Sequence, residues 1–193
     1  MGIFGIIGCL GILAVGAIIL VVIVISLYNK LVGLKNRGEN AWADIDVQLK
    51  KRYDLIPNLV ETVKGYASHE SETLENVIKA RQQAIQITDD VAKMAKAENV
   101  LTQALRQLFA VAESYPDLKA NENFLELQRT LETIENALSE SRRYYNAVVR
   151  DLNTTIEKVP TNFVAMIFHF SKRDYFEIED IAQKEAPKVD FKS

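Results

Sequence analysis

The sequence predicts an all-α protein: an N-terminal transmembrane helix, then an antiparallel bundle of three long helices plus a short fourth helix. Three observations lead to this prediction. No charged residue occurs in residues 2–27. After that segment, apolar residues recur in steps of three and four, as they do on one face of an α-helix. The chain has only eight Gly and four Pro, too few for an all-β or low-complexity protein.

The apolar N-terminal segment is long enough to cross a bilayer. Roughly 25 residues at about 1.5 Å each span a hydrocarbon core of about 30 Å. A cleaved signal peptide would need basic residues before a shorter apolar run, and the first basic residue is Lys30. The stretch Ile-Ile-Gly-Cys at residues 6–9 has the shape of a lipidation box, but no basic residue precedes Cys9. We therefore favour a permanent transmembrane helix, with residues 3–27 in the lipid bilayer.

Basic residues after the apolar segment set its expected orientation. Lys30, Lys35 and Arg37 follow it closely, whereas its N-terminal side offers only the α-amino group. Because cytoplasmic flanks carry the excess of Lys and Arg, we expect the N-terminus outside and the C-terminal domain in the cytoplasm. The alternative places the C-terminal domain on the outer face of the membrane.

The first helical pattern after the anchor covers residues 31–63 and is interrupted by Pro57. Proline removes a backbone donor, and its ring crowds the carbonyl of the residue four positions earlier, Tyr53. We expect a kink there, or a break with Asp54 capping the second half. Gly65 and Ser68 predict the end of this helix and a new start.

Two longer patterns and one short pattern follow. The second helix is expected over residues 70–113, with a local irregularity at residues 88–90, and it ends at Ser114-Tyr115-Pro116-Asp117. The third begins near Asn121, a good N-cap, and ends before Pro160. A short fourth helix is expected over residues 162–170. Short connections between helices predict that consecutive helices pack antiparallel.

The expected domains are a membrane anchor at 1–29, a bundle at 30–170, and a short helix or extended tail at 171–193 on or near the bundle.

The charged part of the chain lacks the residue patterns of common catalytic sites. A di-iron bundle uses Glu-x-x-His, and neither His69 nor His169 has Glu three residues before it. Two His and no Cys after residue 9 argue against zinc, and His169 is expected to be packed or capped. No Gly-x-Ser-x-Gly and no Walker-type loop occurs. We predict no enzyme activity, no cofactor and no metal.

Two short basic clusters occur, and the second is interpreted as a helix surface. On a helix continuous with the membrane span, Lys50-Lys51-Arg52 lies about 30 Å from the headgroups, beyond a Debye length of about 8–10 Å, so headgroup binding by it is disfavoured unless the helix folds back. Arg142-Arg143-Tyr144-Tyr145 could stack on nucleic acid, but it has acidic neighbours and the chain has a net charge of −3. We expect no nucleic-acid partner.

Long ordered motifs are similar to those of the bacterial LemA family. They are ENAWADIDVQLKKRYDLIPNLVETVKGYA at residues 39–67, ALRQLFAVAESYPDLKAN at 104–121, SRRYYN at 141–146 and PKVDF at 187–191. The resemblance covers nearly the whole chain. It implies a single-pass membrane protein with a bundle of long antiparallel helices in the bacterial cell (inner) membrane, and it carries over no catalytic residue. One departure is Ala137, where relatives are expected to have Arg.

The resemblance and the missing chemistry together predict a membrane-anchored, non-enzymatic helical scaffold or adaptor of the cell envelope that self-associates as a homo-oligomer. The alternative is an accessory or signal-relaying subunit of another membrane protein complex. The acids of the first bundle helix are interpreted as a solvated face rather than an acid/base pair. The candidate partner or assembly surface comprises Trp42, Asp44, Asp46, Arg52, Tyr53, Asp54, Pro57, Asn58 and Glu61.

Overall fold

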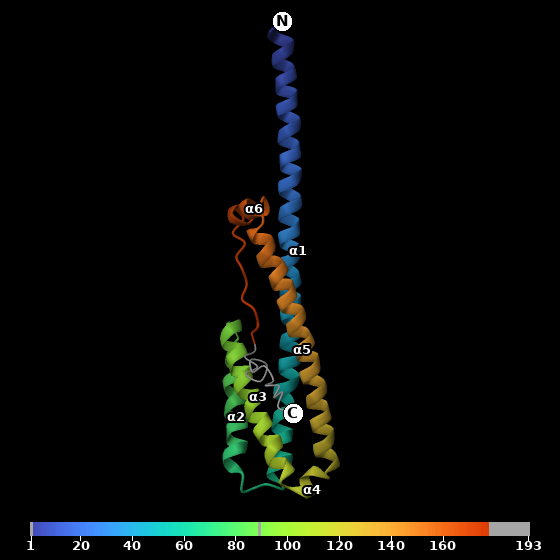
Figure 1. Ribbon diagram of the computed structural model, residues 1–193, viewed down its shortest axis with the longest axis vertical. Helices are drawn as coiled ribbons and strands as arrows, with labels where there is room; N and C mark the ends of the chain where they lie inside the picture. The colour runs from blue at the N-terminus through green and yellow to red at the C-terminus, as the bar shows by residue number, and fades with distance from the viewer. Residues whose placement is uncertain (1, 89, 178–193) are drawn as a thin grey trace, which may run out of the picture. The chain divides into compact units, whose positions relative to one another are not determined.

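The computed structural model of the protein describes residues 2–88 and 90–177, with side chains from Leu10 onward. The elements are α1 (Gly2–Lys64), α2 (Ser71–Ile85), α3 (Val91–Glu113), α4 (Pro116–Lys119), α5 (Glu122–Glu157) and α6 (Thr161–Ile167) (Figure 1). No strand occurs among the described residues, so the all-α prediction is confirmed. Residues 171–177 form no helix, and the rest of the predicted tail lies outside the described residues.

Helix α1 begins in the apolar segment and continues without interruption to Lys64. Its stretch from Leu10 to Lys64 contains a window with a mean hydropathy of 3.1, none of it buried within the protein. By length and composition this helix can cross a membrane. The helix ends before Gly65, where the sequence predicts a stop.

Pro57 lies inside α1 and does not end it. Because proline has no N–H, the carbonyl oxygen of Tyr53 lacks its helical donor. Arg81 of α2 supplies a replacement, since its Nε donates a 2.7 Å hydrogen bond to that oxygen. The expected break with Asp54 as a cap is therefore wrong: a side chain from the neighbouring helix satisfies the carbonyl, and the helix continues.

The pattern over residues 70–113 forms two helices, so the single long helix expected there is wrong. Helix α2 ends at Ile85 and α3 begins at Val91, after the N-cap Asp90, whose carboxylate accepts a 2.9 Å hydrogen bond from the backbone N–H of Lys93. The two helices pack against each other, and Figure 1 shows the chain turning back between them. The irregularity expected at residues 88–90 falls between these two helices, with Asp89 outside the described residues.

The start of α5 agrees with the prediction from the sequence. Asn121 caps α5 as predicted, because its Oδ1 accepts a 2.9 Å hydrogen bond from the backbone N–H of Phe124.

Helix α6 is shorter than the expected 162–170, because His169 has a left-handed backbone with φ of 57°. The N–H groups of Phe170 and His169 bond back to the carbonyls of Ala165 and Met166, which is a Schellman ending.

The described chain divides into two compact units. Unit 1 contains the described residues up to Asp44 together with Arg143–Arg173, and unit 2 contains Ile45–Arg142 together with residues 174–177. The division into compact units does not show which residues lie in a membrane. The division into anchor, bundle and tail at residues 1–29, 30–170 and 171–193 therefore stays a prediction.

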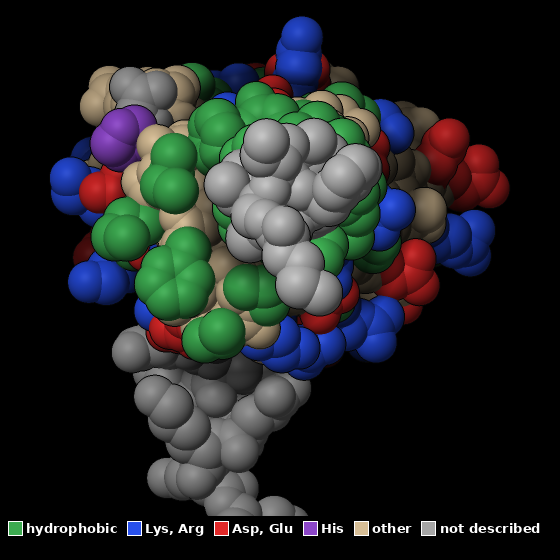
Figure 2. Space-filling model, turned by 90° about the horizontal axis from the view of Figure 1, so that it is seen from above, with side chains coloured by type: hydrophobic (Ala, Val, Ile, Leu, Met, Phe, Trp, Pro, Cys, Tyr) green, Lys and Arg blue, Asp and Glu red, His purple; other side chains and the backbone are tan. Residues whose placement is uncertain are grey.

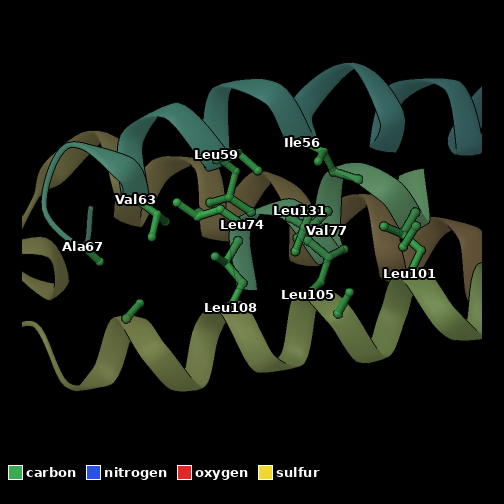
Figure 3. Close-up of a cluster of buried hydrophobic side chains, with 14 of the residues drawn as sticks. Ile56, Leu59, Val63, Ala67, Leu74, Val77, Leu101, Leu105, Leu108 and Leu131 are labelled. Carbon is green, nitrogen blue, oxygen red and sulfur yellow. The ribbon is translucent and has the colours of Figure 1, made fainter. Parts of the chain in front are cut away.

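The core of unit 2 is built mainly from the apolar faces of α1, α2, α3 and α5, and Leu118 of α4 also belongs to it. Figure 3 shows Leu59 and Val63 of α1 directed toward Leu74 of α2 and Leu108 of α3, with Leu131 of α5 beside them. Burying a Leu or Val side chain fully contributes about 1.5–3 kcal/mol relative to leaving it in water. This apolar packing holds the surrounding helices at fixed positions and so fixes any polar group that they carry inward.

Candidate functional site

Three charged side chains occupy core positions in unit 2, one from each of three helices. Arg52 of α1 is 0% exposed, Glu98 of α3 is 1% exposed and Arg142 of α5 is 7% exposed. Arg52 lies between buried Leu49 and Ile56, in the same steps of three and four that place the apolar residues inward. The fold therefore directs these charges toward one another rather than toward solvent.

The carboxylate of Glu98 is the centre of the resulting network. Its Oε2 accepts a 2.7 Å hydrogen bond from Nη1 of Arg52 and lies 3.5 Å from Nη2 of Arg142. Its Oε1 accepts a 2.5 Å hydrogen bond from the hydroxyl of Tyr53. The Nη2 of Arg52 also donates to Oγ1 of Thr102 at 2.9 Å. Three side chains thus share one buried carboxylate.

A second carboxylate balances the charge of the network. The Nε of Arg52 lies 2.8 Å from Oε1 of Glu135, an ion pair whose N–H direction falls short of hydrogen-bond geometry. Glu135 is about one third exposed, at 35%. Two guanidinium groups therefore face two carboxylates. Balance matters because an unpaired charge in a protein interior is strongly unfavourable.

Tyr53 and Arg142 both keep their protons near neutral pH. Burial raises the pKa of the Tyr53 phenol, and the negative charge of Glu98 raises it further, so the hydroxyl remains a donor. Burial lowers the pKa of the Arg142 guanidinium to about 10, although Glu98 acts in the opposite direction, and the group is still charged at pH 7. Neither group is suited to proton transfer near neutrality.

Phe176 covers Arg142 on another side. The guanidinium carbon lies 4.6 Å from the centroid of the Phe176 ring, which is 2% exposed. A cation over an aromatic face at this distance is attracted to the ring. The Nε of Arg142 has no hydrogen-bond acceptor among the described residues, so the ring contact and the ion pair carry much of its stabilisation.

A groove between α3 and α5 opens beside the network. Its volume is about 490 Å³, and Arg52 is one of the residues that line it. Apolar side chains and polar side chains both line it: Leu105, Phe109, Leu131, Thr102, Arg106, Gln128, Glu132 and Glu135. Within the part of the chain that the structure describes, no group of three or more His, Cys, Asp or Glu is placed to hold a metal ion.

The structure divides the predicted assembly surface. Asp44, Asp46, Asp54, Pro57, Asn58 and Glu61 are exposed, Trp42 and Tyr53 are half-buried, and Arg52 is buried. Arg52 and Tyr53 therefore make contacts between helices. Trp42 packs edge-on against Tyr145 of α5 in unit 1, with ring centroids 5.4 Å apart. The partner role of the exposed residues stays a prediction.

Two expectations about individual side chains are wrong, those for Arg142 and His169. Arg52 is buried between helices, whereas Lys50 and Lys51 beside it are exposed. Arg142 is buried too, so this part of the Arg142-Arg143-Tyr144-Tyr145 cluster is not a helix surface. His169, expected to be packed or capped, is exposed. A local reading of charge missed the inward position that α5 gives Arg142, whereas His169 lies beyond the end of α6.

Sequence reasoning missed Glu98 and Arg142 as members of the site, although a signal was present. Glu98 continues the seam of Met94, Leu101 and Leu105, and Arg142 continues that of Leu138, Tyr145 and Val149 in steps of four and three. A single charge in such a position is ambiguous. Charges of opposite sign at seam positions of three different helices indicate a buried ion-pair network.

Comparisons with known proteins agree with the long motifs of the chain. The profile of the LemA family matches residues 41–191. The Protein LemA of Metamycoplasma hominis is 25% identical over 162 residues, which cover 84% of this chain and 72% of that protein. The Magnetosome protein MamQ of Magnetospirillum gryphiswaldense is 22% identical over 174 residues, covering 77% of this chain and 64% of that protein.

A second magnetosome protein is also similar to this chain. The Magnetosome protein MamQ 2 of Paramagnetospirillum magneticum is 22% identical over 175 residues and is covered over 64% of its length. The chain thus spans less than two thirds of each of these two magnetosome proteins. None of these three relatives is named as an enzyme. Because the family profile extends over most of the residues, the chain belongs to the LemA family.

Proposed function

We propose that the protein is a membrane-anchored, non-enzymatic scaffold or adaptor of the bacterial cell envelope that self-associates as a homo-oligomer. The observation that carries this proposal is the division of the polar residues of α1 between two faces. Arg52 points into the charge network, where it forms ion pairs with Glu98 and Glu135, whereas Asp46, Asp54, Asn58 and Glu61 are exposed. The inward face stabilises unit 2, and the outward face is available for contacts.

The chemistry of the network supports a non-enzymatic role. A general acid or base must reach its substrate and exchange protons near the working pH. Glu98 is 1% exposed and accepts hydrogen bonds from Arg52 and Tyr53, so a substrate would have to displace both donors. Breaking a buried ion pair of this kind is strongly unfavourable. The network is better suited to holding three helices together than to turnover.

The exposed face of α1 in unit 2 has the charge pattern needed for pairing with a copy of itself. Asp46, Lys50, Lys51, Asp54 and Glu61 are all exposed on it, so acidic and basic side chains are both present along one helix. In a two-fold symmetric interface the same patch meets itself, which requires such self-complementarity. Val47 adds an apolar contact point, because its side chain is 51% exposed on the same helix.

The self-association is tested on the full-length protein in detergent micelles or nanodiscs, with its mass measured by light scattering. We expect the wild type to be an oligomer and the double variant Asp46→Lys with Asp54→Lys to dissociate. The matched control is Glu126→Lys with Glu140→Lys, which changes two exposed acids of α5 by the same charge. A wild type that stays monomeric at every concentration, or a control that dissociates equally, contradicts the proposed interface.

The proposed topology places the N-terminus outside the inner membrane and the C-terminal domain in the cytoplasm. It is supported by Lys30, Lys35 and Arg37, which follow the apolar segment directly. A reporter fused after Ser193 that is active only in the cytoplasm is the expected result. Activity of a periplasmic reporter at the same position would reverse the orientation and place the domain on the outer face.

An accessory or signal-relaying role for another membrane protein uses the same exposed face. A photo-crosslinking amino acid at Asp54 distinguishes this alternative, because that side chain is exposed and lies opposite the buried face of α1. A scaffold that pairs with itself yields a crosslinked homodimer in cells. A single different membrane protein in the crosslinked product supports the accessory role instead.

A further inference from the structure

Helix α6 packs against α1 at the C-terminal end of its apolar segment. Within unit 1, Val164 and Ala165 of α6 form a buried cluster with Leu31 of α1, and Val24 and Leu27 of α1 pack against that cluster. Figure 1 shows α6 beside α1, at the end of α5. Val24 and Leu27 belong to the charge-free residues 2–27. Helix α6 therefore reaches the part of α1 that has the composition of a membrane span.

The opposite side of α6 and its flanking residues present apolar side chains to the surroundings. The exposed fractions are 75% for Val159, 55% for Phe163, 68% for Met166, 65% for Ile167 and 47% for Phe168. Residues 159–168 contain no charged side chain. Figure 2, viewed from the N-terminal end of α1, shows hydrophobic side chains gathered on the face toward the viewer. Clustered exposed apolar groups of this kind mark a contact surface.

Aromatic and basic residues lie next to this apolar turn. The ring of Tyr28 lies 4.7 Å from that of Phe168 and 5.8 Å from that of Phe170. A cavity of about 380 Å³ adjoins them and is lined partly by Lys35 and Arg173. Where a membrane protein leaves the bilayer, aromatic rings commonly lie at the depth of the headgroups and basic residues follow them.

We propose that residues 159–168 insert into the same bilayer leaflet through which α1 leaves the membrane. The occupant of the exposed apolar face is then lipid. From Val24 to Leu31 the helix rises about 10 Å, which covers the edge of the hydrocarbon core and a headgroup layer of about 5–8 Å. Because α6 is packed over this interval, its exposed side chains lie at the depth of the outer acyl chains and headgroups.

Insertion of α6 gives the anchor a second point of attachment. An interfacial apolar element is stabilised in proportion to the apolar area that it buries in the headgroup and acyl boundary. Since α6 is packed on α1 through Val164 and Ala165, its depth fixes how far α1 can slide along the membrane normal. This inference rests on the proposed anchoring of α1, and its test separates the two.

The test measures the depth of single side chains in the full-length protein reconstituted into phosphatidylcholine and phosphatidylglycerol vesicles. A Cys9→Ser background carries one cysteine at Phe163 or Met166, labelled with a fluorophore that nitroxide lipids quench. Val22, 60% exposed in the apolar segment, is the membrane control, and Tyr144, 54% exposed on α5, is the aqueous control. We expect loss of fluorescence at 163 and 166, stronger with nitroxide near the headgroup than near the chain end.

The outcomes distinguish the insertion from the anchoring. Quenching at position 22 without quenching at 163 and 166 overturns the insertion of α6 and leaves the anchor of α1 intact. No quenching at any of the three positions overturns both. Quenching at 163 and 166 together with an unquenched label at 144 supports the insertion, because residue 144 belongs to the same unit. Circular dichroism on each labelled protein confirms that the helices are retained.

A second variant tests the effect on the depth of α1. Phe163→Ser with Met166→Ser removes two exposed apolar side chains without changing the buried side of α6. We expect the ratio of shallow to deep quenching at position 22 to change. Val100→Ser, at a side chain 50% exposed on α3, is the matched control and should leave that ratio as it is in the wild type. An unchanged ratio in both variants contradicts a role of α6 in fixing depth.

Discussion

The Nε of Arg81 donates a 2.7 Å hydrogen bond to the backbone carbonyl oxygen of Tyr53, four residues before Pro57. That carbonyl would otherwise lack a donor, because Pro57 has no N–H. One side chain of α2 thus satisfies the group that proline leaves unpaired in α1. The contact also fixes α2 along α1, because the guanidinium reaches only the turn of α1 in which the proline lies.

Replacing Pro57 with Ala should make this contact dispensable. The backbone N–H of the new alanine can donate a hydrogen bond to the Tyr53 carbonyl. In the wild type, Arg81→Met should therefore lower the free energy of unfolding by about 1–3 kcal/mol. In a protein that already carries Pro57→Ala, the same substitution should lower it by much less. Urea denaturation followed by circular dichroism of the four proteins gives the coupling energy. An equal loss in both backgrounds would show that Arg81 acts by some contact other than the carbonyl.

Removing the central carboxylate of the charge network should destabilise unit 2 strongly. Glu98→Gln leaves Arg52 and Arg142 buried with only the partly exposed Glu135 to balance them. Loss of one partner of a buried pair costs about 3–5 kcal/mol, which urea denaturation of the variant would measure. Glu75→Gln is the control, since it breaks the exposed pair with Lys79 and should cost about 0–1 kcal/mol.

A compensating substitution checks that charge, rather than shape, causes the loss. Adding Arg52→Met to Glu98→Gln removes one of the two uncompensated guanidinium groups while keeping a long side chain in the core. The double variant should therefore be more stable than Glu98→Gln alone. If stability falls further, the packing and hydrogen bonds of Arg52 matter more than the charge balance.

The helices could be predicted from the sequence because their signals are local. Apolar steps of three and four set the buried faces, and Asn121 is a recognisable cap. The turn between α2 and α3 was harder, because no Gly or Pro occurs from Ile85 to Val91. Its signal is the N-cap Asp90, and a single capping residue does not distinguish a turn from a slight irregularity. Packing of α2 on α3 decides it.

The charge network could not be predicted in the same way, because its contacts join distant residues. Arg52 and Glu98 are 46 positions apart, and Glu98 and Arg142 are 44 positions apart. Helical periodicity shows that each occupies an inward position, but it does not show which charges meet. Pro57 was read as a point of weakness for the same reason, since its compensation by Arg81 comes from another helix.

The phenol of Tyr53 should make stability depend on pH in the alkaline range. Burial and Glu98 raise its pKa above the ordinary value of 10, so the folded protein keeps a proton that the unfolded chain loses. This contribution is complete below pH 10 and is lost as the pH rises further. Tyr53→Phe removes it, so the free energy of unfolding should fall less steeply with pH in the variant than in the wild type.

The lowered pKa of Arg142 has the opposite effect on the pH dependence of stability, so Arg142 must be present in both proteins that are compared. With its pKa lowered to about 10, the unfolded chain binds more protons than the folded protein above that pH, so this group increases stability as the pH rises. Both proteins retain Arg142, so the difference between their slopes reports Tyr53 together with its electrostatic coupling to Arg142. Identical slopes for wild type and Tyr53→Phe would mean that this phenol does not hold its proton in the folded state.

Replacing His169 with Gly should stabilise the end of α6. The backbone of His169 has φ of 57°, a left-handed conformation that costs a residue with a Cβ about 1–2 kcal/mol and costs Gly little. Gly at this position of a Schellman ending should therefore slow hydrogen exchange of the Phe170 amide, which bonds to the Ala165 carbonyl at 2.9 Å. His169→Ala is the matched control, because it removes the imidazole but keeps the Cβ. Slower exchange in the Gly variant alone identifies backbone conformation as the cause, whereas equal exchange in both variants would assign the effect to loss of the imidazole.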